Sequence, residues 1–281
     1  MSDLSRPVLD GVLAALLVAG AGGAMLAASL GGSRPAVSER VTREGGTIFL
    51  GESLMHRAYA LAEPLAGACV RAGIGADALS WLGLALGVGA GVAVAVRLPG
   101  MAAWLLALGG GCDLLDGAVA RRSAQPGRGG AVLDSALDRY SEAAFHAGLL
   151  VWYAGAIGWQ LLVLASLFGG MMVTYSTAKA EALAIPPPRA WMKRPERVVW
   201  LLLGAVATAI SGAAGGPRRP VMAAALAIVA VFANLSAVRR LAALRRAAEF
   251  TAPKPPAGVA APQTGSGDRS SAPRPPETPA F

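Results

Sequence analysis

Long apolar stretches separated by short polar segments constrain this chain more than any other feature of its sequence. A helix needs roughly 20 mostly apolar residues to cross a bilayer. The chain contains seven candidate stretches, of which Val198–Ile210 is shorter than this length. The stretches are Val8–Leu30, Ala76–Val96, Met101–Ala120, Ala131–Ala154, Gly158–Leu183, Val198–Ile210 and Val221–Val238. Hydrophobic residues make up 54% of the 281, far more than a soluble core of this size needs. We therefore predict an all-α integral membrane protein.

The stretches suggest a division into four parts. Residues 1–47 hold an extra N-terminal transmembrane span and a linker, because the first stretch lacks a basic leader and a clear cleavage site. A signal peptide or an interfacial segment is the alternative for it. Residues 48–75 mix apolar and charged side chains like an amphipathic interfacial helix, which Pro64 should bend or break. We expect a six-helix transmembrane core over 76–246 and a disordered tail over 247–281.

Charge indicates the orientation and the partners of the chain. The net charge is +8, and basic residues gather at alternate ends of the apolar stretches, which predicts that those ends are cytoplasmic and meet anionic lipid headgroups. Nucleic acid is a poor partner for such a pattern. The paired Arg218 and Arg219 fall on the opposite side, against the rule. Cys69 and Cys112 indicate neither a disulfide framework nor a thiolate metal site.

Four aspartates cluster around one predicted turn between two spans. Asp113 and Asp116 are three residues apart near the end of one span, while Asp134 and Asp138 are four apart near the start of the next. Each pair therefore shares a helix face. A charge inside a span costs about 2.5–3.5 kcal/mol, so such residues are candidates for function.

The chemistry of this cluster points to a cation and a phosphate. Converging carboxylates repel unless cations neutralise them, and oxygen ligands without His or Cys suit Mg²⁺ or Mn²⁺. Metal-assisted phosphoryl transfer follows. Gly117 and Gly130 would let a nucleotide approach closely, and Arg121 can pair with a phosphate. Buried ion pairs or a cation-transport path are the alternatives.

The order of these residues resembles a known signature. From Asp113 the sequence reads D-L-L-D-G-A-V-A-R, then eight residues, then G-A-V-L-D and S-A-L-D. This resembles the CDP-alcohol phosphotransferase signature at every fixed position: Asp113, Asp116, Gly117, Ala120, Arg121, Gly130, Asp134 and Asp138. A weaker match, A-D-A-L-S-W-L-G from Ala76, resembles the segment opening the first core helix, where Asp77 can also act as an N-cap.

The resemblance covers about Leu50 to Arg246 and implies a fold and a mechanism. It implies a homodimer of six-helix subunits in the cell inner membrane, with the active site facing the cytoplasm. Asp113, Asp116 and Asp134 would hold one or two divalent ions on the diphosphate of CDP-diacylglycerol. Asp138 would lie near the metal and act as general base. The CDP-lipid would be contacted at Gly117, Ala120, Arg121 and Gly130. A small polar alcohol then attacks the lipid-side phosphorus, and CMP leaves.

The acceptor is indicated by a second basic group. Lys179 with Glu181, and the loop Lys193–Arg197, resemble segments of phosphatidylinositol phosphate synthases, although Lys179 replaces an arginine of that subfamily. The resemblance implies inositol 1-phosphate as acceptor, with Lys179, Arg194 and Arg197 on its phosphate. Glycerol 3-phosphate, as in a phosphatidylglycerophosphate synthase, is the alternative acceptor. A positive-inside loop with a structural ion pair also explains these residues. A non-catalytic scaffold or an ion-binding transporter is the alternative class.

Two further polar residues continue the face of Asp134 and Asp138. Glu142 and His146 follow at four-residue steps, deeper in the same predicted helix. We expect them to form a buried hydrogen-bonded pair. Lining of the acceptor cavity is the alternative.

Overall fold

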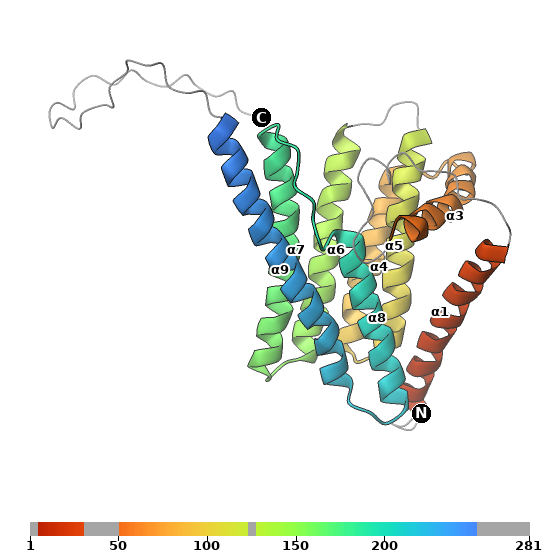
Figure 1. The fold of residues 1–281 in the computed structure, drawn as a ribbon. Helices are drawn as coiled ribbons and strands as arrows, with labels where there is room; N and C mark the ends of the chain where they lie inside the picture. Colours follow the sequence, from red (N-terminus) through yellow and green to blue (C-terminus); the bar gives the residue numbers. More distant parts are fainter. Residues whose placement is uncertain (1–4, 31–50, 123–127, 252–281) are drawn as a thin grey trace, which may run out of the picture.

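The computed structural model describes residues 5–30, 51–122 and 128–251. Within these ranges the chain forms eight α-helices and no strand. In chain order they are α1 (Ser5–Leu30), α3 (Gly51–Arg71), α4 (Ala76–Ala95), α5 (Pro99–Arg122), α6 (Arg128–Trp152), α7 (Ile157–Ala182), α8 (Arg194–Ala213) and α9 (Arg218–Thr251). Figure 1 shows a bundle of roughly parallel and antiparallel helices, with α3 running across them at one end. The all-α prediction is confirmed.

Six of the described helices are long and apolar enough to cross a membrane, namely α1, α4, α5, α7, α8 and α9. The remaining core helix, α6, has 25 residues but carries the polar face of Asp134, Asp138, Glu142 and His146. α6 packs along α4 and also contacts α7, and His146 of this polar face is fully buried. The chain is therefore an integral membrane protein in which the partly polar α6 packs with the apolar helices.

Glycines bring α4 and α6 into close contact. A Cβ on Gly91 would collide with the carbonyl of Ala144, and one on Gly148 with the carbonyl of Gly91. Gly87 faces Ser141 in the same way, whereas Gly83 faces Cys112 of α5. Small residues allow helix backbones to approach within a membrane, where packing replaces the hydrophobic drive. The glycine stripe of α4 is thus used within the subunit, and it holds α4 between α5 and α6.

The extra helix α1 is part of the same bundle, where it packs on α5 and α8. Asp10 is 2% exposed, and its carboxylate accepts the backbone N–H groups of Gly100 (2.9 Å) and Met101 (3.0 Å) in the first turn of α5. Trp104 donates its indole N–H to the carbonyl of Leu13 at 2.8 Å. Asp10 therefore satisfies the N-terminus of a helix distant in sequence.

The C-terminal end of α9 lies beyond the end that the sequence predicted. α9 continues to Thr251, past both Val238, where the apolar stretch ends, and residue 246, where the core was expected to end. The extension is an Ala-, Leu- and Arg-rich segment with strong helix propensity. Arg239 stacks over Trp191 at 3.7 Å, and Arg240 donates to Thr177 at 2.8 Å. Residues 252–281 of the predicted tail lie outside the described residues.

Helix α3 is tied to the end of α5 where the aspartates lie. The helix runs unbroken through Pro64. Arg122 pairs with Glu63 at 2.7 Å, and the guanidinium of Arg121 lies over the ring of Tyr59 at 5.8 Å. These contacts place the predicted interfacial helix beside the candidate site.

Candidate metal and phosphate site

Three of the predicted aspartates come together between α5 and α6. Asp113, Asp116 and Asp134 each offer one carboxylate oxygen, and these oxygens lie within 4.8 Å of one another. The i, i+3 spacing directs Asp113 and Asp116 to one face of α5, and Asp134 reaches that face from the second turn of α6. The packing of α4 against both helices fixes their separation. The predicted convergence of these carboxylates is found.

The start of α4 supports this cluster from the other side. Ser80 donates its hydroxyl to Asp116 Oδ2 at 2.8 Å, and Asp116 is only 6% exposed. Asp77 lies close to Gly130, where a Cβ would stand 3.3 Å from Asp77 Oδ1. The N-cap of α4 is Gly75, without a side-chain cap hydrogen bond, so Asp77 does not take the N-cap role that the sequence left open for it. Asp77 lies instead in the first turn, facing the start of α6.

Arg194 joins the carboxylates of two helices. Its guanidinium donates to Asp138 at 2.7 Å and to Asp113 at 2.9 Å. Asp138 is therefore next to the three clustered aspartates but is paired with Arg194. Figure 1 shows that α8 begins well below the upper ends of α5, α6 and α7, and the segment before it runs down to that level. This start brings Arg194 to the depth of the aspartates.

The donor set fits a hard divalent cation. Four carboxylates, from Asp113, Asp116, Asp134 and Asp138, meet one guanidinium, and this excess of negative charge in a partly buried site favours a cation. Oxygen ligands of this kind suit Mg²⁺ or Mn²⁺, which bind phosphate oxygens at the same time. The arrangement can bind a metal and a phosphorylated ligand together.

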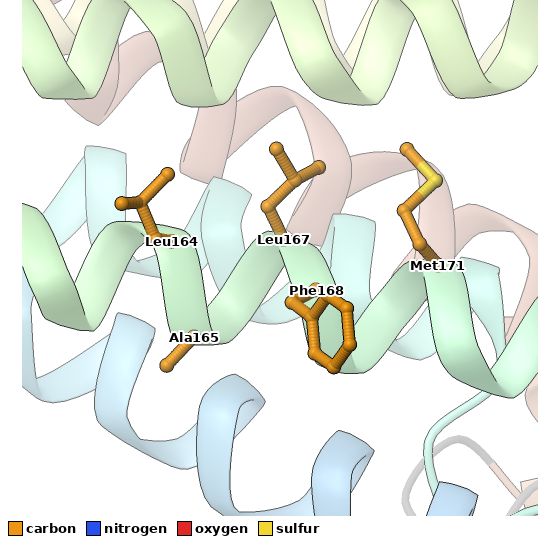
Figure 2. A pocket seen from close by; sticks show the side chains of 5 residues that line it. All are labelled: Leu164, Ala165, Leu167, Phe168 and Met171. Atoms are coloured by element: carbon orange, nitrogen blue, oxygen red, sulfur yellow. The ribbon is translucent and has the colours of Figure 1, made fainter.

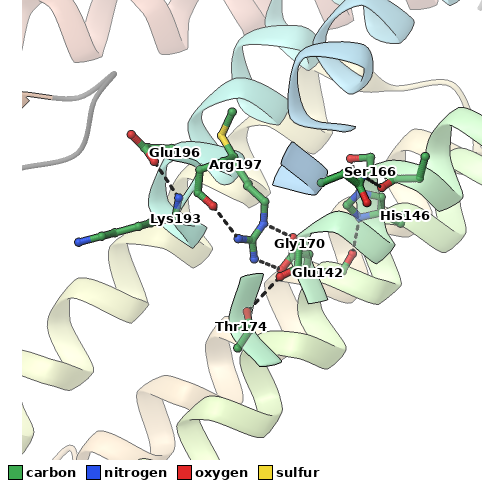
Figure 3. A network of polar contacts seen from close by, with 11 residues as sticks. Glu142, His146, Ser166, Gly170, Thr174, Lys193, Glu196 and Arg197 are labelled. Atoms are coloured by element: carbon green, nitrogen blue, oxygen red, sulfur yellow. Dashed lines mark hydrogen bonds and ion pairs between the residues drawn. The ribbon is translucent and has the colours of Figure 1, made fainter. Parts of the chain in front are cut away.

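A second ion pair lies one turn further along both helices. Arg197 donates from Nε and from Nη2 to the two carboxylate oxygens of Glu142, both at 2.7 Å (Figure 3). The side chains are 1% and 7% exposed. Arg197 was expected to contact the acceptor phosphate, but its guanidinium is buried and occupied by Glu142. The reason is helical geometry, since three residues after Arg194 the chain has turned into the bundle.

The ion pair belongs to a larger polar network (Figure 3). His146 Nδ1 lies 2.8 Å from the backbone oxygen of Glu142, and Nε2 lies 3.1 Å from Ser166 Oγ of α7. His146 thus bonds to the backbone of Glu142 and not to its carboxylate, as part of the expected buried network. On α8, Glu196 accepts the N–H of Lys193 at 2.7 Å and closes the first turn. The first turn of α8 is therefore held by the hydrogen bond between Lys193 and Glu196 and by the ion pair of Arg197 with Glu142.

The two ion pairs form a ladder between α6 and α8. Asp138 and Glu142 are four residues apart on α6, and they pair with Arg194 and Arg197, three apart on α8. The spacing matches because one helical turn separates the members of each pair. The buried pair of Glu142 and Arg197 ties α8 to α6, and so it sets where the guanidinium of Arg194, which is 25% exposed, lies. Sequence reasoning missed this pairing, although the four-residue steps of α6 were visible.

The remaining predicted residues lie around this centre. Gly117 and Ala120 continue α5 beyond Asp116, and Arg121 is exposed above Tyr59. Lys179 is exposed in the last turn of α7 and is not brought into contact with the carboxylates. Ser80 was missed as a supporting residue. The signal for it was the weaker A-D-A-L-S-W-L-G match.

An apolar groove lies elsewhere on the surface. It has a volume of about 490 Å³ and is lined by Leu164, Ala165, Leu167, Phe168 and Met171, all from α7 (Figure 2). None of these side chains is polar enough to hold a phosphate. The groove is therefore separate from the carboxylate site.

Comparison with known proteins agrees with this geometry. Residues 74–242 match the family described as CDP-alcohol phosphatidyltransferase. The phosphatidylinositol phosphate synthase of Mycobacteroides abscessus is 37% identical over 156 residues, which cover 52% of this chain and 68% of the relative. That of Cutibacterium acnes is 30% identical over 195 residues, covering 66% and 93%.

Solved structures of a related enzyme share the fold. The phosphatidylinositol phosphate synthase of Mycobacterium tuberculosis in complex with manganese and citrate has a TM-score of 0.59 and 28% identity, covering 66% of this chain and 88% of that one. The same enzyme with CDP-DAG bound has a TM-score of 0.58 and 28% identity, covering 65% and 92%. The described core therefore has the fold of a protein that binds a CDP-activated lipid.

Proposed function

Since the chain belongs to the CDP-alcohol phosphatidyltransferase family, we propose that it transfers the phosphatidyl group of CDP-diacylglycerol to a phosphorylated alcohol. The observation that carries the proposal is the convergence of Asp113, Asp116 and Asp134, whose carboxylate oxygens lie within 4.8 Å of one another. These residues come from the two halves of one signature. Inositol 1-phosphate is the proposed acceptor, and CMP is the second product.

Asp113, Asp116 and Asp134 are the proposed ligands of the divalent cation, Mg²⁺ or Mn²⁺. The related M. tuberculosis enzyme has been solved with manganese, which supports this choice. When bound, the cation would neutralise the diphosphate of the CDP-lipid and so stabilise the departing phosphate. Ser80 keeps Asp116 oriented for this role, because its hydroxyl donates a hydrogen bond to one oxygen of the Asp116 carboxylate.

The transfer itself needs a base and room for the nucleotide. The acceptor hydroxyl attacks the phosphorus that carries the diacylglycerol, its proton passes to the carboxylate of Asp138, and the bond from phosphorus to CMP breaks. Gly117, Ala120 and Gly130 have little or no side chain and leave space for the CDP group, while Arg121 adds positive charge near its phosphates. Catalysis rests on positioning and on charge neutralisation.

Arg194 is the proposed contact for the acceptor phosphate. In the structure Arg194 pairs with Asp113 and Asp138. A bound metal would compete with Arg194 for the carboxylate of Asp113, and the acceptor phosphate would compete with the two carboxylates for the guanidinium. A guanidinium recognises phosphate and carboxylate with the same planar fork. Release of Asp138 from Arg194 when the acceptor binds would free that carboxylate to take the proton. Lys179 is the second proposed basic residue at the acceptor.

Glycerol 3-phosphate remains the second candidate acceptor, since it also offers a phosphate to Arg194. A scaffold or a transporter would have no need for the ordered contact between Ser80 and Asp116. The similarity to phosphatidylinositol phosphate synthases supports inositol 1-phosphate over glycerol 3-phosphate as the acceptor, and an enzyme over a scaffold or a transporter.

The proposed location is the cell inner membrane, with the site facing the cytoplasm. The arginines of the α5, α8 and α9 ends near the carboxylates support this orientation under the positive-inside rule. It places the start of α1 on the other side. We further propose a homodimer, as the family resemblance implies.

The test is CMP release by the purified protein with CDP-diacylglycerol and Mg²⁺. Inositol 1-phosphate, glycerol 3-phosphate, free inositol and serine are compared as acceptors, and Asp134→Asn serves as the blank. We expect release with inositol 1-phosphate. Release with glycerol 3-phosphate alone would establish the second candidate, and no release from folded protein with any acceptor would refute the enzymatic assignment.

A further inference from the structure

Three arginines gather at the end of the bundle opposite the aspartates. Arg97 lies in the turn between α4 and α5, and Arg218 and Arg219 begin α9. Figure 1 shows this end, where α8 finishes and α9 starts near the beginning of α1. These residues, here called the distal arginine cluster, have no part in the transfer reaction. They also oppose the positive-inside pattern of the rest of the chain.

The contacts of the cluster leave its charge largely uncompensated. Arg218 donates to the carbonyl of Arg97 at 2.5 Å, and Arg219 donates to the carbonyl of Trp152 at 3.0 Å. Carbonyl oxygens accept hydrogen bonds but do not cancel a positive charge. The near carboxylate is Asp10, 3.9 Å from Arg218, and it already accepts two backbone N–H groups of α5. Among the residues that the structure describes, three positive charges therefore share one carboxylate that is already hydrogen-bonded.

The surrounding residues form a shaped site around these charges. A cavity of about 440 Å³ is lined by the three arginines, by Trp152, and by Gly216, Pro217 and Pro220. Arg218 stacks over Trp152 at 5.7 Å. The hydroxyl of Tyr153 donates to the carbonyl of Arg219 at 2.7 Å. The N-terminus of α9 adds the positive end of a helix dipole.

Arg97 occupies a backbone conformation that favours glycine. Its φ is +68°, at the position directly after the C-cap of α4. The corresponding residue after α8 is Gly215, with φ +74°. A left-handed residue with a Cβ is strained. Ala184, which directly follows the C-cap of α7, also has a positive φ of +53°, so the backbone conformation alone assigns no role to the Arg97 side chain.

We propose that the distal arginine cluster binds the phosphate of an anionic phospholipid headgroup, in the leaflet opposite the active site. The turns that carry the cluster end apolar helices of membrane-spanning length, so the arginines lie at headgroup depth. Stacked Tyr153 and Trp159, with centroids 5.8 Å apart, suit the same interface. Guanidinium forks and a helix N-terminus both recognise phosphate oxygens. Excess positive charge selects an anionic lipid over a zwitterionic one.

The test uses delipidated full-length protein and native mass spectrometry. The protein is titrated with phosphatidylglycerol, and the affinity of the tightest site is compared in Arg97→Gly, Arg219→Gln and the control Arg245→Gln. We expect about tenfold weaker binding in each of the first two variants, since each loses one charge-assisted contact. Arg245 is 83% exposed, far from the cluster, and its variant should bind like the parent.

Arg97→Gly also separates binding from stability. It relieves the strained φ while removing the guanidinium, so its melting temperature should equal or exceed that of the parent while its lipid affinity falls. If it fails to fold, Arg219→Gln carries the test. Unchanged phosphatidylglycerol affinity in the folded variants would overturn the proposal.

Two further arms identify the source of the phosphate. Phosphatidylcholine should bind about tenfold more weakly than phosphatidylglycerol, and equal binding would refute the preference for anionic lipid. Millimolar inorganic phosphate should leave bound phosphatidylglycerol in place. Displacement of the lipid by phosphate would show that the cluster binds free anions and would overturn the proposal of a lipid site.

Discussion

The buried pair of Glu142 and Arg197 gives the most direct test of how α8 is held. Glu142→Gln keeps the shape of the side chain but removes its charge. Arg197 is then a cation that is 1% exposed, has lost its counter-charge, and faces an NH2 group in place of one of the two oxygens that accepted its bonds of 2.7 Å. Removing one partner of a buried pair typically costs about 3–5 kcal/mol. We expect the free energy of unfolding to fall by about this amount.

A double-mutant cycle separates the pair from general damage. Arg197→Met alone leaves a buried carboxylate, whereas Glu142→Gln with Arg197→Met leaves no unpaired charge. The double variant should therefore be more stable than the sum of the single effects predicts, by about 1–3 kcal/mol. Unfolding in mixed detergent micelles, followed by circular dichroism, measures all four proteins. Glu249→Gln, which breaks an exposed pair with Arg245, is the control and should change stability by less than about 0.5 kcal/mol.

The same variants report on the position of Arg194. If the buried pair sets where that guanidinium lies, folded Glu142→Gln should show a raised KM for the phosphorylated acceptor and an unchanged KM for the CDP-lipid. Additive stability effects would refute the coupling. An unaltered acceptor KM in folded protein would refute the positioning role.

Three other perturbations test separate contacts. Asp10→Ala removes the acceptor for the first turn of α5 and should lower the unfolding free energy by about 1–2 kcal/mol, as loss of an N-cap does; stability equal to the parent in the same detergent assay would contradict this. Ser80→Ala deprives Asp116 of a hydrogen bond and should weaken Mn²⁺ binding, measured by titration calorimetry, by about tenfold, and unchanged affinity would count against that contact. Arg194→Gln should raise the KM for a phosphorylated acceptor by at least about tenfold. The KM for CDP-diacylglycerol should show no such change, and an equal effect on both substrates would deny Arg194 its contact with the acceptor phosphate.

The sequence predicted helices better than it predicted their ends. Hydropathy located each core helix because a membrane demands a fixed apolar length. It stopped α9 at Val238, although the helix continues to Thr251, because the extension is polar and leaves the apolar part of the bundle. The sequence also placed α6 in the core in spite of its polar residues, because Asp134 and Asp138 are spaced so that they share one helix face. A helix can thus be located by hydropathy, while its end depends on propensity and contacts.

The candidate site shows a similar division. The aspartates lie close together in sequence, so helix periodicity and the short turn between the two spans were enough to predict that Asp113, Asp116 and Asp134 meet. Ser80 and Asp116 are 36 residues apart, and Arg197 and Glu142 are 55 apart, so neither contact has a local signal. Arg194 and Arg197 look equivalent in a basic loop, yet one turn of α8 sends the first to the carboxylates and buries the second. Depth in the bundle, which the sequence does not encode locally, decided which arginine is available.

The contact between Asp10 and α5 has a consequence for biosynthesis. Asp10 is made 90 residues before Gly100, the backbone group it binds. During translation α1 must therefore enter the membrane with a carboxylate whose partner has not yet been synthesised. The helix can complete its docking only after α4 has inserted and α5 has begun to emerge. Assembly of the first helix is thus complete only once the third described transmembrane helix has begun to form.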